Sequence, residues 1–177
     1  MIVSVEKIKD LVSFPGWTDE KIAMKLKAVE QTIRAYTNNN FQERGYRIRA
    51  DIWGGVLMSD SLIPFAIDDT VQISESQYNN GLFTVSAVTD DTTFQVNEDI
   101  RDEDGVLITK VVYPDDVVAC CVNLMEWEVN HRGKVGIKSE TLSRHSVTYF
   151  DQDANNQVMG YPATLLGCLK PYRKARF

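Results

Sequence analysis

Residues 18–52, TDEKIAMKLKAVEQTIRAYTNNNFQERGYRIRADI, contain the change of periodicity that decides the fold. In the first half, apolar side chains recur at intervals of three or four residues, which predicts a helix with one apolar face. They are Ile22, Leu26, Val29, Ile33 and Tyr36. From Tyr46 to Ile52, apolar and polar side chains alternate, which is typical of a half-buried strand. A helical segment therefore gives way to a β segment after the asparagine run 38–40.

Three more helices are expected outside this stretch. Residues 4–14 read as a short helix capped by the serine at its start. Pro114 opens a helix over 115–132, because a proline at the start of a helix loses no intrahelical hydrogen bond. A last short helix is expected between Pro162 and Pro171.

The helix over 115–132 has two apolar rows instead of one. The first row is Val118, Val122, Met125 and Val129, and the second is Val117, Cys120, Leu124 and Trp127. A helix that is apolar around most of its circumference is usually buried on two sides. It is therefore either the central helix of its domain or a subunit-interface helix, with the second row as the interface residues.

Apolar and polar side chains continue to alternate in the segment between the helix that ends at the asparagine run and the helix over 115–132. Further strands are expected at 71–73, 83–88, 94–96 and 106–113. Asn80-Gly81 predicts a type I′ hairpin turn, because both central residues of that turn need positive φ. The segment 42–113 is thus expected to be an antiparallel β module of about five strands, a small barrel.

These elements predict an α+β fold in which a small helical bundle of about four helices is interrupted by an antiparallel β-barrel-like insertion. A helix with a single apolar stripe cannot close a core alone, so the helices before and after the insertion must pack together. The discontinuous helical domain comprises residues 1–41 and 114–177, and the inserted β module comprises residues 42–113.

The chain is acidic, but its charge is unevenly distributed. Its 177 residues carry a formal net charge of −6. Residues 42–113 hold five basic and thirteen acidic side chains, a charge of −8, which disfavours a protein that wraps nucleic acid. The C-terminus instead concentrates four basic residues, Lys170, Arg173, Lys174 and Arg176. This distribution fits an assembly protein, and it also fits plain solubility.

The residues that usually carry chemistry are scarce and badly spaced. His131 and His145 are the only histidines in the sequence, and neither has a cysteine or carboxylate at metal-ligand spacing. Three cysteines, of which Cys120 and Cys121 are adjacent and Cys168 is distant, predict neither a disulfide framework nor a zinc site. With no nucleophile motif such as G-x-S-x-G present, we expect no catalytic residues, no metal, no cofactor and no enzyme.

Both ends of the chain resemble the head–tail connector (adaptor) proteins of long-tailed bacteriophages. The opening, VEKIKDL…TDEKIAMKLKAVEQTIRAYTNNNF, resembles the N-terminal helices of that family. The ending, GIKSETLSRHSVTYFDQD…GYPATLLGCLKPYRKARF, is similar to its strand, loop, final helix and basic tail. The resemblance covers roughly residues 5–41 and 114–177. The β module at 42–113 is a departure from the short members of the family, so its role is not implied.

The resemblance implies a structural virion protein that forms a homo-oligomeric, twelve-fold ring below the portal. Such a ring extends the DNA channel and provides the platform for a stopper or tail-completion protein, while DNA passes through the lumen without specific binding. The implied location is the neck of the virion, with the host cytoplasm during assembly. The tail residues expected to dock on the portal protein are Lys170, Tyr172, Arg173, Lys174, Arg176 and Phe177.

Two other classes of function stay open. The β module could be an OB-like barrel that binds nucleic acid through Tyr46, Arg47 and Arg49, although its −8 charge counts against this. An enzyme with an unrecognised site would show a pocket with converging titratable groups.

Overall fold

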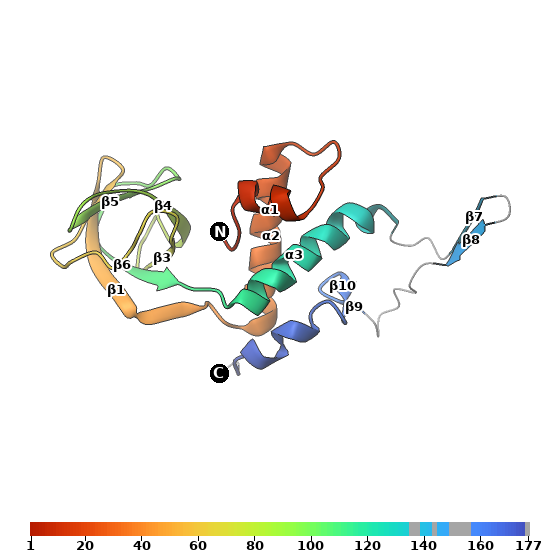
Figure 1. Ribbon diagram of the computed structural model, residues 1–177. Helices are drawn as coiled ribbons and strands as arrows, with labels where there is room; N and C mark the ends of the chain where they lie inside the picture. The colour runs from red at the N-terminus through yellow and green to blue at the C-terminus, as the bar shows by residue number, and fades with distance from the viewer. Residues whose placement is uncertain (135–138, 143–144, 149–156, 176–177) are drawn as a thin grey trace. The chain divides into compact units, whose positions relative to one another are not determined.

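The structure, a computed structural model, describes residues 1–134, 139–142, 145–148 and 157–175. The chain divides into two compact units. One comprises Met1 with Asn40–Tyr113, and the other comprises Ile2–Asn39 with Pro114–Phe177. The first unit is built of strands, whereas the second contains the three α-helices (Figure 1).

Six antiparallel strands of the first unit close into a barrel. They are β1 (Gln42–Trp53), β2 (Val56–Met58), β3 (Thr70–Ser74), β4 (Gly81–Asp90), β5 (Thr93–Val96) and β6 (Glu103–Val111). Their order around the barrel is β1-β2-β5-β4-β3-β6, and the long pairing of β6 with β1 completes the ring (Figure 1). Closure leaves the sheet without a free edge. The predicted antiparallel barrel is confirmed, with β2 as a strand that the sequence pattern did not indicate.

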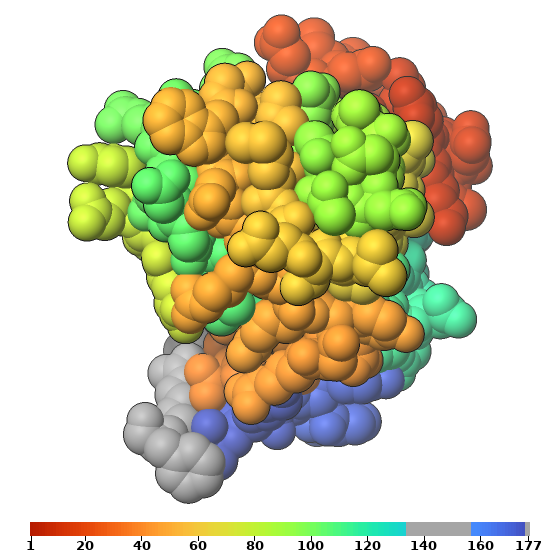
Figure 2. All heavy atoms as spheres, turned by 90° about the vertical axis from the view of Figure 1, so that its left-hand side faces the viewer, coloured from red at the N-terminus to blue at the C-terminus, as the bar shows by residue number. Residues whose placement is uncertain are grey.

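The alternation of polar and apolar residues predicted for β1 corresponds to an alternation of exposed and buried side chains in the barrel. Ile48 and Ile52 are buried. Arg47, which precedes Ile48, and Arg49, which lies between the two isoleucines, are exposed. Twelve buried side chains make the core: Ile48, Ala50, Ile52, Leu57, Phe65, Val71, Ile73, Val85, Phe94, Val96, Val106 and Ile108. Figure 2 shows the outside of this unit, where the orange side chains of β1 lie beside the green side chains of its neighbouring strand β6.

The turn between β3 and β4 differs from the predicted type I′ hairpin. Ile73 pairs with Gly81, which is already the first residue of β4, and neither Asn80 nor Gly81 has positive φ. The connection between the paired residues Ile73 and Gly81 is longer than a two-residue turn, and side-chain hydrogen bonds hold it together. The Asn80 side chain bonds to both backbone groups of Ser76, and Glu103 of β6 accepts the Ser76 hydroxyl at 2.5 Å.

The second unit contains three α-helices, two 3₁₀ helices and four short strands in its described part. In chain order they are α1 (Val5–Leu11), α2 (Asp19–Thr37), α3 (Asp115–Asn130), η1 (Arg132–Lys134), β7 (Ser139–Leu142), β8 (His145–Thr148), β9 (Gln157–Val158), β10 (Tyr161–Pro162) and η2 (Gly167–Tyr172). Ser4 caps α1 through its hydroxyl group, as the sequence predicted, and Thr18 caps α2 in the same way. Helices α2 and α3 contact each other, and η2 contacts both.

The final helix is tighter than expected. It is a 3₁₀ helix, and Pro171 lies inside it instead of ending it. The N–H groups of Leu169 and Arg173 each donate to the carbonyl three residues earlier, which is the pattern of 3₁₀ winding. Leu166 and Leu169 are fully buried, so the short element still supplies apolar side chains to the core.

Among the helices in the described ranges, none is both long and apolar enough to span a lipid bilayer.

Candidate assembly surface

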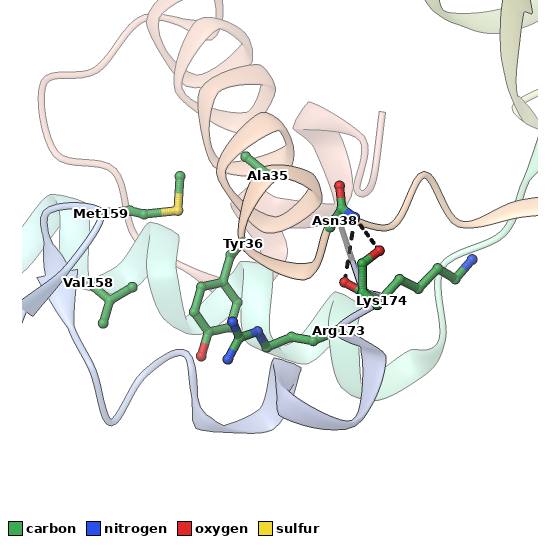
Figure 3. Close-up of a pocket in the computed structure, with 8 residues that line it drawn as sticks. Ala35, Tyr36, Asn38, Val158, Met159, Arg173 and Lys174 are labelled. Carbon is green, nitrogen blue, oxygen red and sulfur yellow. Dashed lines mark hydrogen bonds between the residues drawn. The ribbon is translucent and has the colours of Figure 1, made fainter. Parts of the chain in front are cut away.

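The C-terminal segment is fastened to the end of α2 through its backbone. The N–H of Lys174 donates to the carbonyl of Thr37 at 2.7 Å. Asn38 has left-handed φ and donates from its side chain to the carbonyl of Ala175 at 2.9 Å (Figure 3), and Asn39 donates to the carbonyl of Tyr172 at 3.3 Å. The asparagine run that ends α2 therefore also holds the tail in place.

Two aromatic contacts complete this attachment. The hydroxyl of Tyr172 lies 2.7 and 2.8 Å from the two carboxylate oxygens of Asp116 at the start of α3. This hydrogen bond raises the pKa of Tyr172, because only the neutral phenol can donate it. The Arg173 guanidinium lies 5.3 Å from the centre of the Tyr36 ring. The segment up to Ala175 is thus a fixed part of the helical unit.

The charges of this segment nevertheless face solvent. Lys170, Arg173 and Lys174 are exposed, and Tyr172 is half-buried. The structure therefore brings together four of the six residues predicted to dock on a partner. The other two, Arg176 and Phe177, lie outside the described residues.

A depression of about 480 Å³ lies beside the basic segment. Its lining residues are Ala35, Tyr36, Asn38, Val158, Met159, Arg173, Lys174 and Ala175. Val158 and Met159 approach from β9 and the following turn, whereas the Lys174 side chain points away from them (Figure 3). Positive charge beside apolar side chains suits a protein surface that carries acidic and aliphatic groups.

A buried carboxylate lies in the same unit as this depression. Glu128 of α3 has a side chain that is 2% exposed, and it pairs with Lys25 of α2 at 3.1 Å and with Arg132 at 2.6 Å. The hydroxyl of Tyr161 donates to the same carboxylate at 2.6 Å. Burial alone would raise the pKa of Glu128, but the hydrogen bonds from Arg132, Tyr161 and Lys25 outweigh it and lower the pKa to about 2.

Arg132 connects this carboxylate to the chain that carries Met159. Its guanidinium lies 4.3 Å from the Trp127 ring centre and 4.8 Å from that of Tyr161, and it donates to the carbonyl of Gly160 at 2.8 Å. The cluster thus joins α2, α3 and η1 to the β9–β10 turn. The sequence does contain a signal for this cluster that was not among the predictions, a glutamate four residues before an arginine on an expected helix.

The predicted subunit-interface residues of α3 lie inside the single chain. Val117, Cys120, Leu124 and Trp127 are between 0% and 8% exposed. Burial of this row was expected if α3 is the central helix of its domain, and it leaves the row little surface for a neighbouring subunit. The partly buried side chains of the other row are Val118, Val122 and Val129. A subunit contact through α3 stays a prediction, and it would have to use these three.

The barrel residues proposed as nucleic-acid readers have partners within the barrel. The Arg47 Nε donates to the Thr109 hydroxyl at 2.9 Å, and Arg49 pairs with Glu75 at 2.5 Å. Tyr46 is half exposed. An arginine that is already paired with a carboxylate gains less free energy by binding a phosphate. This face is therefore a weak candidate for binding nucleic acid.

Comparison with known proteins adds no family to this geometry. The sequence matches no protein-family model and no curated protein. Within the described parts of the chain, no three or more His, Cys, Asp or Glu side chains gather to hold a metal ion. The function is therefore argued from the surfaces described above.

Proposed function

We propose that the chain is the structural subunit of a phage head–tail connector, a ring that sits below the portal and carries the stopper and tail. In this proposal α1, α2, α3 and η2 act as one small helical bundle, the connector domain, and the barrel is an insertion. The proposal rests on the basic C-terminal segment. Hydrogen bonds hold the backbone of this segment in place, while its charged side chains face solvent.

A fixed cluster of cations on an acidic chain has little value for solubility alone. With a net charge of −6, extra positive charge brings the chain closer to neutrality, which lowers solubility. Each exposed ion pair with a partner contributes only about 0.2–1 kcal/mol. Repetition around a ring multiplies this effect, because each bound subunit raises the effective concentration of the next contact. An acidic surface on the portal protein is the proposed partner.

The other surfaces fit the same proposal. Neighbouring subunits in a ring make heterologous contacts, for which the outer row of α3, Val118, Val122 and Val129, is the proposed site. The charge of −8 in residues 42–113 would let a passing DNA duplex slide without being gripped.

Reversal of the tail charges tests the proposal without disturbing the fold. Truncation after Leu169 would also remove the contacts of Tyr172 and Lys174, so the variant Lys170→Glu/Lys174→Glu is preferable. It should fold normally and yield DNA-filled heads that lack tails in negative-stain electron microscopy. The matched control is Lys7→Glu/Arg44→Glu, which changes the net charge equally at two exposed positions elsewhere. Normal tail attachment by the tail variant would exclude the docking role.

The alternative, a nucleic-acid-binding barrel, makes an opposite prediction. It requires salt-dependent binding of oligonucleotides that is weakened by Arg47→Ala. We expect no such binding, because the basic side chains of this face are paired internally and the unit is acidic.

A further inference from the structure

Two cysteines from different elements share one backbone acceptor. The Cys120 sulfur on α3 lies 3.4 Å from the carbonyl oxygen of Leu165, and the Cys168 sulfur in η2 lies 3.5 Å from the same oxygen. Because both sulfurs contact the same oxygen, they lie less than 7 Å apart, and a disulfide requires the two side chains to rotate until the sulfurs are about 2 Å apart.

The two thiols differ in access to solvent. Cys120 is 1% exposed, whereas Cys168 is exposed. An oxidant in solution can therefore reach Cys168 before it reaches Cys120. Cys121, the neighbour of Cys120 in sequence, is fully buried.

We propose that Cys120 and Cys168 form an oxidation site, at which a low-molecular-weight disulfide such as oxidised glutathione closes an intramolecular disulfide between α3 and η2. The site does not depend on the connector proposal. If the chain is a connector subunit, the disulfide would fasten the basic segment to α3 once the particle leaves the reducing cytosol.

The reaction takes two exchange steps. In the first, the Cys168 thiolate attacks the small disulfide, which gives a mixed disulfide on Cys168 and releases one small thiolate. In the second, the Cys120 thiolate attacks the Cys168 sulfur and displaces the other small thiolate. The protons lost by the two protein thiols are taken up by the two small thiolates. Two protein thiols are oxidised, and one small disulfide is reduced to two thiols.

The second step should be the slow one. Burial raises the pKa of the Cys120 thiol far above its usual range. Little Cys120 thiolate is present at neutral pH, so the mixed disulfide on Cys168 should accumulate there. Mildly alkaline conditions should speed its conversion to the Cys120–Cys168 disulfide.

The experiment treats the reduced full chain with oxidised glutathione and maps its peptides without reduction by mass spectrometry. The expected product is a monomer with a Cys120–Cys168 cross-link, which forms faster at alkaline than at neutral pH. The thermal midpoint should rise by roughly 5 °C, because the disulfide constrains the unfolded chain. Cys168→Ser should abolish the cross-link, and Cys121→Ala, the matched control, should keep it.

Two outcomes would overturn the proposal. One is a glutathione adduct on Cys168 that persists at alkaline pH in the folded chain. The other is a dimer linked through Cys168 of two copies, which would show that the exposed thiol reacts between molecules. Neither outcome bears on portal docking, which the charge-reversal variants test separately.

Discussion

The hydroxyl of Tyr161 and the carboxylate of Glu128 lie 2.6 Å apart, and their hydrogen bond joins β10 to α3. Lys25 and Arg132 neutralise the same carboxylate. A buried charge with this many partners is stable only while all of them are present. Single substitutions in this cluster are therefore expected to destabilise the helical unit.

Glu128→Gln should destabilise the protein at neutral pH. The pKa of Glu128 falls from its ordinary 4.5 to about 2 on folding, a difference that corresponds to about 3 kcal/mol. Urea denaturation at neutral pH should report a loss of about that size. Glu126→Gln, an exposed position on the same helix, is the control and should change little.

The pH dependence of this effect has a definite direction. Because the folded pKa is lowered, the contribution of Glu128 is complete above about pH 4.5 and is lost as the pH falls towards 2. The stability difference between the native protein and Glu128→Gln should therefore shrink between these values. A difference that stays constant down to pH 2 would show that the carboxylate is not held ionised.

Tyr161→Phe isolates one hydrogen bond of the cluster. The ring is kept, so its packing near Trp127, at 5.3 Å between ring centres, should survive. Loss of a donor to a buried carboxylate should cost about 1.5–3 kcal/mol, measured by urea denaturation. Combined with Glu128→Gln, the two losses should not add, because both remove the same bond. Full additivity would contradict the assigned contact.

Trp127→Asp separates the core role of α3 from its proposed assembly role. Trp127 is 8% exposed and lies under the Arg132 guanidinium, so a carboxylate there should abolish folding of the helical unit. Circular dichroism would show the loss of helix. Val122→Asp, in the partly exposed row, should instead fold and fail to form rings in native mass spectrometry. Rings formed by Val122→Asp would exclude this row as the subunit contact.

Deletion of residues 43–112 with a short Gly-Ser bridge should leave a folded helical protein. The barrel has its own core, which includes Phe94 and Ile108, both fully buried within that unit. The helical unit keeps α1, α2, α3 and η2 in the deletion product. Circular dichroism should show a helical spectrum and a cooperative thermal transition. An unfolded product would show that the two units depend on each other for stability.

The sequence predicted the barrel better than its turns. Alternation around Ile48 and Ile52 reports directly which side chains face a core, so strand positions follow from local pattern. The Asn80 turn was wrong because Glu103, distant in sequence, organises the preceding loop through Ser76. Tertiary hydrogen bonds of this kind leave no local signal.

At the candidate surface, too, some features have a local signal in the sequence and others do not. The clustering of Lys170, Arg173 and Lys174 was visible in sequence, but their fixed backbone was not, because it depends on Thr37 and Asn39 at the end of α2. Likewise, periodicity identified α3 as apolar on two sides without showing which row the chain itself buries. Val117 and Leu124 proved to face the interior.

The proposed connector role is tested most directly by whether the purified chain binds a purified portal ring encoded by the same genome. Mass photometry of the mixture should show the portal ring with a full ring of this chain attached. The complex should be lost with Lys170→Glu/Lys174→Glu and kept with Lys7→Glu/Arg44→Glu. If the portal ring stays unbound, or if the tail variant binds as well as the native chain, the account of this protein as a connector that docks through its basic segment is contradicted.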